Sequence, residues 1–447
     1  MRHEAPAWWS AAIVVALAGT ATFAASPMST AGAEESAMNW IRFGGRPADQ
    51  VATRAYDRQF VRQWEANPPR GYPTISRKNI DATRDAIERY RRIVKEGGWG
   101  AVAGGRLEVG LTSNDVRALQ QRLIASGEFR GAASGYFDYD TERALKRFQA
   151  TNGLTPTGVV DARTRTALNV PAQARLKQLQ INLNRLRSVA QSDKHRYVVV
   201  NIPAAQIEAV EDGRVVSRHS GVVGKRDRRT PILASRIHEL NFNPVWRLPP
   251  TVVTKDLIPK GRQMARANQN VLKKFGIDAY EGGRKIDPDK IKWNTGQPYR
   301  LSYRQQSGED NPLGFVKINF HNQHSVYLHD TPSDRLFGRN FRAASSGCVR
   351  VQNVEELITW LLRDTNGWSI NDVHRVKKSG KTKTVRLKRS VPLQLVYLTA
   401  WATEDGVVQF RRDLYHRDGV GQLAANYCAA PRGAPGGRAP GSGRPRR

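Results

Sequence analysis

The sequence predicts a multidomain α+β protein, in which a small three-helix domain precedes a mostly antiparallel β domain with a helical capping insertion. Three observations support this prediction. The chain has 447 residues, which is too many for one ordinary core. Residues 111–170 show helical periodicity with repeated capping signals. From Tyr197 onward the pattern changes to short β-branched runs with hairpin turns, which residues 251–300 interrupt.

The first 33 residues have the order of a secretory signal peptide. Arg2 and His3 precede an apolar run over residues 7–18, and the small residues Ala-Gly-Ala follow at 31–33. The apolar run is short for a spanning helix, which needs about 20 residues. We therefore expect export, with an uncleaved membrane anchor as the alternative.

The charge of the chain indicates an anionic partner. Lys and Arg number 71 against 40 Asp and Glu, which gives a net charge of +31. An anionic polymer or an envelope surface fits an exported protein, whereas nucleic acid does not. Residues 429–447 are almost entirely Pro, Gly and Arg, so we expect a disordered basic tail that is either solvated or in contact with the envelope.

The N-terminal half is predicted to be helical. In residues 34–109, a scaffold region, Thr83, Ile87 and Tyr90 recur at helical spacing. Residues 110–171 are expected to form three short helices, with Ser113 and Asp161 among the N-caps. Residues 172–196 predict a basic linker helix with leucines along one face.

The β domain is expected at residues 197–376, with strands from 377–418 packing on it. Short strands are predicted between 197 and 242, and Asp212-Gly213 marks a hairpin. The insertion, residues 251–314, is expected to be mainly helical over 252–269 and broken near Pro259 and Gly261. An insertion of this length usually serves a function, such as a lid. A passive surface excursion is the alternative.

Two reactive side chains, His329 and Cys348, lie close together in the sequence. Residues 315–329 alternate as a hairpin, and on its returning strand Tyr327 and His329 share one face. Cys348 follows Ser345-Ser346-Gly347. A thiol reacts as thiolate, and we expect a helix starting near Asn353 to favour that anion through its macrodipole. The alternative is a buried structural cysteine.

The surroundings of the pair suggest acyl-transfer chemistry. The backbone N–H groups of Gly347 and Cys348 are candidates for an oxyanion hole, and Arg350 supplies a positive charge suited to a substrate carboxylate. Asp330 follows His329 and suggests a triad. Adjacent strand residues point to opposite faces, so we expect a backbone carbonyl to orient His329 instead.

The order His-Asp-Thr-Pro at 329–332 followed by Ser-Ser-Gly-Cys-Val-Arg-Val at 345–351 resembles the active-site motif of YkuD-type L,D-transpeptidases. Segments 222–225, 242–246 and 397–401 look like the large YcbB-type branch. Residues 110–171 resemble the peptidoglycan-binding domain found beside wall enzymes. The resemblance runs roughly from Asp81 to Asp418. The chain departs from the pattern at Ser307, Pro312 and His321.

The resemblance implies the roles of the site residues. Cys348 would be the nucleophile and His329 the base, Ser346 and Gly347 would shape the pocket, Tyr327 would bind or polarise the substrate carbonyl, and Arg350 would hold a substrate acid. Cys348 would attack the third-residue carbonyl of a peptidoglycan tetrapeptide stem and release D-alanine. A second stem's amine would accept the acyl group, giving a 3→3 cross-link.

The resemblance further implies no metal or organic cofactor, acylation by carbapenems, and a place in the periplasm or cell envelope with stem peptides and glycan as partners. Hydrolysis as an L,D-carboxypeptidase and attachment of a protein amine remain open. A non-catalytic wall-binding protein conflicts with the intact His329 and Cys348. A zinc site from His321, His324, His329 and Cys348 fits no common spacing. A Cys348–Cys428 disulfide would remove the nucleophile.

Overall fold

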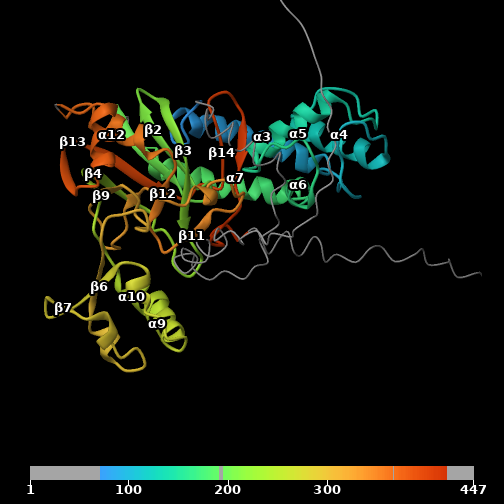
Figure 1. Cartoon of the computed structure of the whole chain (residues 1–447). Helices are drawn as coiled ribbons and strands as arrows, with labels where there is room; N and C mark the ends of the chain where they lie inside the picture. The colour runs from blue at the N-terminus through green and yellow to red at the C-terminus, as the bar shows by residue number, and fades with distance from the viewer. Residues whose placement is uncertain (1–70, 191–194, 366, 420–447) are drawn as a thin grey trace, which may run out of the picture.

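The computed structural model describes residues 71–190, 195–365 and 367–419 (Figure 1). The signal peptide expected at 1–33, Cys428 and the basic tail expected at 429–447 lie outside the described residues. Within the described ranges, no helix is both long enough and apolar enough to cross a bilayer.

Three short helices form the small domain that the sequence predicts, with its own apolar core. They are α4 (Asn114–Ser126), α5 (Tyr139–Thr151) and α6 (Ala162–Leu168). Each N-cap side chain accepts a hydrogen bond from the backbone N–H three residues on, at Ser113, Asp138 and Asp161. The expected caps at Ser113 and Asp161 are thereby confirmed.

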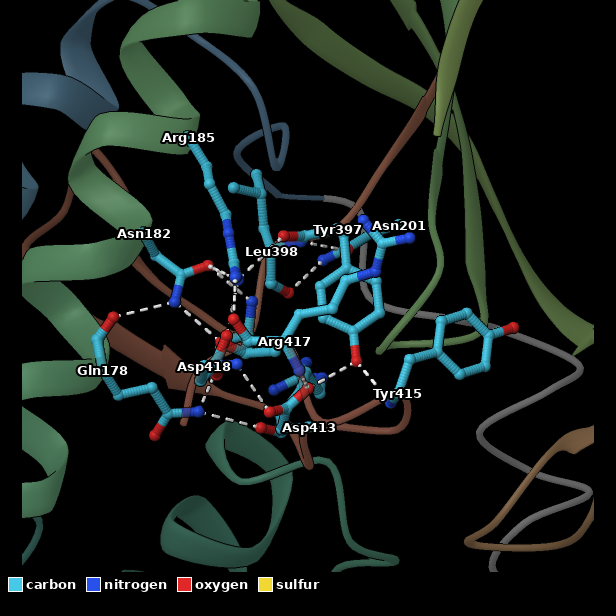
Figure 2. A network of polar contacts seen from close by, with 12 residues as sticks. Gln178, Asn182, Arg185, Asn201, Tyr397, Leu398, Asp413, Tyr415, Arg417 and Asp418 are labelled. Atoms are coloured by element: carbon cyan, nitrogen blue, oxygen red, sulfur yellow. Dashed lines mark hydrogen bonds and ion pairs between the residues drawn. The ribbon is translucent and has the colours of Figure 1, made fainter. Parts of the chain in front are cut away.

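Two long helices connect the three-helix domain to the rest of the chain. α3 (Lys78–Lys95) and α7 (Ala172–Val189) pack together, and both contact β14 (Ala400–Ala402), which pairs with β15 (Val408–Phe410). α7 buries polar residues as well as leucines. Figure 2 shows Gln178, Asn182 and Arg185 of α7 pointing toward the C-terminal segment. There Asn182 donates to Thr399 Oγ1 over 2.7 Å.

The main sheet has nine strands in the order β11-β3-β12-β10-β9-β4-β13-β1-β2, and β2 also pairs with β3, which closes eight of them into a ring. Six strand pairs are antiparallel; β1–β13, β10–β12 and β3–β11 are parallel. The sheet is therefore mostly antiparallel, as predicted. Its strands are β1 (Arg196–Asn201), β2 (Gln206–Glu211), β3 (Arg214–Gly224), β4 (Leu233–Phe242), β9 (Val316–Phe320), β10 (Leu328–His329), β11 (Ala343–Ser345), β12 (Val349–Val351) and β13 (Lys383–Val396).

Apolar residues from the strands pack against α11 (Val354–Leu362) and α12 (Ile370–Ser379) to form the largest core. Strands alternate residues between two faces, so their buried positions supply one side of this core. β9 illustrates the pattern, because Val316, Ile318 and Phe320 are buried while Lys317 and Asn319 are half-buried on the other face.

The insertion is a separate lobe with its own core, drawn in yellow beneath the sheet in Figure 1. Its helical part runs without a break from Pro250 to Ala265, through α8 (Pro250–Val252), a π-helical turn (Val253–Leu257) and α9 (Ile258–Ala265). α10 (Val271–Lys274) follows. A second sheet, not expected from the sequence, joins β5 (Trp246–Arg247), β8 (Ser302–Gln305), β6 (Ile277–Glu281) and β7 (Arg284–Ile286).

The predicted break near Pro259 and Gly261 is wrong. Pro259 lies directly after the π-helical turn, where the backbone hydrogen-bond register changes and a missing N–H costs little. Gly261 gives the helix a flat patch for Trp293, because a Cβ there would lie 2.3 Å from an indole carbon. Close packing therefore accounts for this glycine.

Candidate active site

The site lies on one face of three neighbouring strands, β9, β10 and β12. His329 on β10 is paired with Lys317 on β9 and with Arg350 on β12. Residues in register on adjacent strands point the same way, so an imidazole stands between two cationic side chains. The sequence does not reveal that Lys317, His329 and Arg350 lie side by side, because their alignment depends on the register of three strands.

Cys348 immediately precedes β12, and Tyr327 immediately precedes the neighbouring strand β10. The Val349 N–H donates to the Tyr327 carbonyl over 3.1 Å, which fixes this alignment. The Tyr327 ring stands edge-on to the His329 ring with centroids 5.7 Å apart. Tyr327 and His329 therefore share a face, as the hairpin pattern predicted, and the structure brings Cys348 to them.

Tyr327 connects the thiol to the insertion. Its hydroxyl and its backbone N–H face Cys348 and oppose the rise that burial causes in the pKa of the thiol. The Trp246 Nε1–H, from β5 of the second sheet, donates to the Tyr327 hydroxyl over 3.2 Å. The phenol thus lies at the junction of the main sheet and the insertion.

Both candidate reactive groups are neutral at pH 7 in this structure. Burial raises the pKa of the Cys348 thiol, and hydrogen bonds from Tyr327 with the charges of Lys317 and Arg350 oppose that rise. Burial lowers the pKa of His329 to about 3, helped by the positive charge of Arg350. A neutral imidazole is able to accept a proton at any pH above this value.

The expected orientation of His329 by a backbone carbonyl is confirmed. His329 Nδ1 lies 2.5 Å from the Asp330 carbonyl oxygen. A carbonyl only accepts, so Nδ1 carries the proton and Nε2 keeps its lone pair. The Asp330 carboxylate instead accepts from the Phe315 N–H over 2.9 Å, away from the imidazole. The Pro312 carbonyl also faces His329, which places one departure from the family pattern beside the imidazole.

The turn before Cys348 is held by hydrogen bonds. The Ser345 hydroxyl donates to the Cys348 carbonyl and accepts from the Gly347 N–H over 3.1 Å. Thr230 Oγ1 donates to the Gly347 carbonyl over 2.9 Å. Gly347 has φ of 119°, which L side chains rarely adopt, so the turn requires glycine here.

Two expectations about this turn need correction. The Gly347 N–H already bonds to Ser345, so in this structure it does not point into an open oxyanion site. Strand β12 separates Cys348 from α11, which begins at Val354. A helix macrodipole acts within about one turn of its end, so the expected helix does not assist the thiolate.

Ser346 and Arg350 occupy different surroundings. The Ser346 hydroxyl accepts from Arg228 Nη1 over 2.8 Å. The same guanidinium forms a two-pronged ion pair with Asp256 of the insertion, at 2.5 and 2.9 Å. Arg350 is only 6% exposed and donates to Thr331 Oγ1 over 3.2 Å.

Two of the three histidines considered for zinc, His321 and His324, have other surroundings than His329 and the thiol. His321 stacks on His238 with ring centroids 4.1 Å apart, and His324 is exposed in the turn. Among the described residues, the group close enough for a shared metal ion is His195, Glu211 and Asp212, which lies where β1 begins and β2 ends.

Sequence reasoning missed Lys317, Trp246 and Arg228. For Lys317 a signal exists, because it alternates with apolar residues on the strand preceding the His329 strand. Trp246 and Arg228 reach the site through folding alone, since Trp246 belongs to the second sheet and Arg228 to the loop after β3.

Comparison with known proteins assigns these regions. Residues 195–378 match the YkuD family model, described as "L,D-transpeptidase catalytic domain", and residues 112–168 match "Putative peptidoglycan binding domain". A curated "Putative L,D-transpeptidase" of Haemophilus influenzae is 34% identical over 246 residues, which is 54% of this chain and 48% of that protein. The chain thus spans about half the length of this relative.

Solved structures give weaker likenesses. An L,D-transpeptidase of Xylanimonas cellulosilytica has 18% identity and a TM-score of 0.23, covering 66% of this chain and 98% of that one. One from Stackebrandtia nassauensis has 14% identity and a TM-score of 0.26, covering 66% and 95%. Scores this low support no argument. The family models and the curated relative carry the comparison: residues 195–378 of this chain match the L,D-transpeptidase catalytic domain of the YkuD family, and residues 112–168, which precede them, match a peptidoglycan-binding domain.

Proposed function

We propose that this protein cross-links peptidoglycan stem peptides, with Cys348 as nucleophile and His329 as base. The observation that carries the proposal is the convergence of the thiol, the Tyr327 hydroxyl and a neutral imidazole on one face of adjacent strands, inside the matched catalytic domain. The imidazole keeps its Nε2 lone pair, as a general base requires.

The proposed reaction has two steps. Cys348 Sγ attacks the third-residue carbonyl carbon of a tetrapeptide stem while His329 takes the thiol proton. The C–N bond then breaks as His329 returns this proton to the amine of the departing D-alanine. In the second step, the side-chain amine of another stem's third residue attacks the thioester, loses a proton to His329 and releases the thiol, giving a 3→3 cross-link.

The oxyanion of each tetrahedral intermediate needs donors aimed at it. We assign this role to the Tyr327 hydroxyl and the Cys348 N–H, because the Gly347 N–H is bonded to Ser345. Ser346 and Gly347 then shape the pocket through the turn. Binding of a substrate acid by Arg350 stays a prediction, since that guanidinium is buried against Thr331.

The partners follow from the same assignment. A peptidoglycan-binding domain ahead of a transpeptidase domain supports glycan and stem peptides as ligands, in the periplasm or cell envelope. The net charge of +31 supports contact with an anionic envelope surface.

Mass spectrometry of the products from disaccharide-tetrapeptide tests the reaction class. Transfer predicts a dimer lacking one D-alanine. A tripeptide product alone would mean that water is the acceptor, as in an L,D-carboxypeptidase. Adding a protein amine as competitor tests attachment, because a protein–muropeptide adduct would form at the expense of the dimer.

Cys348→Ala is expected to abolish D-alanine release from tetrapeptide muropeptides while binding to isolated walls persists. The matched control is Cys428→Ser, which should turn over at the wild-type rate. D-alanine release by the Cys348→Ala protein would exclude the mechanism, and loss of activity in Cys428→Ser would implicate the second cysteine instead.

A further inference from the structure

Lys317 places an ammonium group over the site. Its Nζ lies 4.5 Å from the centroid of the Tyr327 ring, and its backbone is paired with His329. No carboxylate of the described residues lies within 4.0 Å of this nitrogen, and no described residue accepts a hydrogen bond from it. A half-buried cation without an anion is costly, because burial disfavours its charge.

The charged and titratable groups around this ammonium are few. On the site side are Cys348, Tyr327, His329 and Arg350. From the neighbouring elements, Glu239 of β4 and Arg247 of β5 act on it. Glu239 is engaged by Asn319 at 3.0 Å and Asn241 at 3.1 Å. On the site side, the group that can carry a negative charge beside Lys317 is the Cys348 thiol, because burial raises the pKa of the Tyr327 hydroxyl well above its ordinary value.

The usual counter-ion of a catalytic thiolate is an imidazolium. His329 is poorly suited to that task, because it is buried between Lys317 and Arg350 and stays neutral at pH 7. The Arg350 guanidinium is buried and donates a hydrogen bond to Thr331. A primary ammonium on a flexible stem, by contrast, follows a negative charge over short distances.

We propose that Lys317 is the counter-ion of the Cys348 thiolate. His329 takes the thiol proton and later returns it to the departing D-alanine amine, while the Lys317 ammonium stays next to the sulfur anion until the C–S bond forms. His329 is thereby neutral again and ready for the proton of the incoming amine. The inference rests on the proposed function only in taking Cys348 as the reacting thiol.

The test is the pH dependence of Cys348 alkylation by iodoacetamide, measured in the full chain carrying Cys428→Ser. Lys317→Met is expected to move the midpoint upward by about one to two pH units, because the nearby positive charge is lost. Lys317→Arg keeps a charge that cannot act as a base, and should keep the midpoint within about half a unit of the parent. Lys290→Met, at an exposed lysine of the insertion, is the matched control and should not shift it.

The outcomes distinguish a counter-ion role of Lys317 from a structural role and from a role as base. An unchanged midpoint in Lys317→Met, with reduced turnover or thermal stability, would assign Lys317 a structural part and overturn the proposal. Equal upward shifts in the Met and Arg variants would make Lys317 a base and also overturn it. Alkylation does not depend on turnover, so failure of the transpeptidase assignment, seen as D-alanine release by Cys348→Ala, is distinguishable from failure here.

Discussion

Burial keeps both His219 and His329 neutral at pH 7, and His219 lies outside the candidate active site. Its Nε2 contacts the Ser217 hydroxyl at 2.9 Å and its Nδ1 contacts the Gln352 carbonyl at 3.0 Å. Burial lowers the pKa of His219 to about 4. The unfolded chain binds a proton at this residue below pH ~6.5, whereas the folded chain does not until pH ~4. Folding stability is therefore lost as the pH falls between these values.

His219→Gln is expected to reduce this acid sensitivity. Comparing urea unfolding at pH 7.5 and 4.5, the variant should lose about 2–3 kcal/mol less than the wild type. His324→Gln, at an exposed histidine, is the control and should behave like the wild type. An unchanged difference between the two pH values in His219→Gln would contradict the assignment, whatever the variant's absolute stability.

Tyr327 offers a second prediction at this scale. Tyr327→Phe keeps the ring under Lys317 but removes the hydroxyl that faces the thiol and accepts from Trp246. If the hydroxyl stabilises the oxyanion, kcat for D-alanine release should fall about 100-fold with little change in KM. Tyr299→Phe, exposed in the insertion, is the control. A wild-type kcat in Tyr327→Phe would remove the phenol from the mechanism.

At the scale of elements, the insertion contacts the turn that precedes Cys348. Asp256 lies in the π-helical turn of the insertion and pairs with Arg228, whose side chain is 6% exposed. Arg228 in turn holds the Ser346 hydroxyl. A π-helical turn within an α-helix is often found at functional sites. Movement of this lobe would therefore displace the residue two positions before Cys348.

Asp256→Asn is expected to lower kcat by about tenfold or more, because Ser346 loses its fixed anchor while the nucleophile remains. The buried guanidinium without its carboxylate should also lower the melting temperature. Steady-state kinetics of D-alanine release give the first quantity. Asp289→Asn breaks an exposed pair with Lys273 in the same lobe and serves as control. Equal kinetics in both variants would mean that the insertion does not govern the turn.

At the scale of the whole molecule, the three-helix domain contacts the segment that leads to Cys348. The Thr155 N–H and hydroxyl donate to Asn340 Oδ1 over 2.9 and 3.0 Å, and Asn340 lies between β10 and β11. Arg411 Nη1 donates to the Thr151 carbonyl over 2.9 Å. The domain is therefore held in one orientation relative to the site.

The C-terminal segment is also connected, through polar contacts, to the turn that contains Gly347. Asp413 accepts from the Tyr397 hydroxyl over 2.6 Å, and the same hydroxyl accepts from the Tyr415 N–H over 2.7 Å (Figure 2). The Tyr415 hydroxyl accepts from the Thr230 N–H over 3.1 Å, and Thr230 holds Gly347. A continuous chain of polar contacts thus joins the C-terminal segment to the loop that holds the turn.

Asn340→Ala is expected to leave the affinity for isolated walls unchanged and to slow D-alanine release from them several-fold, because the bound stem is less well oriented. Turnover of soluble muropeptides should change less. Thr155→Ala should have the same effect, without adding to it in the double variant, whereas Thr166→Ala, exposed on α6, should have none. Equal slowing on both substrates would indicate damage to the site itself.

Local patterns in the sequence were sufficient for several features. The caps at Ser113 and Asp161 follow from side chains that satisfy the first N–H groups of a helix. The shared face of Tyr327 and His329 follows from the two-residue period of a strand. The same period excluded the Asp330 carboxylate as the partner of His329, which the contact with the Asp330 carbonyl confirms.

The tertiary structure alone decided what surrounds the thiol. The parallel pairing of β10 with β12 brings Cys348 beside Tyr327, and no local signal encodes a pairing between segments separated by a long loop. The same register places Lys317 and Arg350 on either side of His329, and folding of the insertion brings Asp256 to Arg228. The sequence by itself therefore determined the candidate reactive groups, through a motif of neighbouring residues. Their charge states depend on burial and on cations contributed by other strands, which only the folded chain brings together.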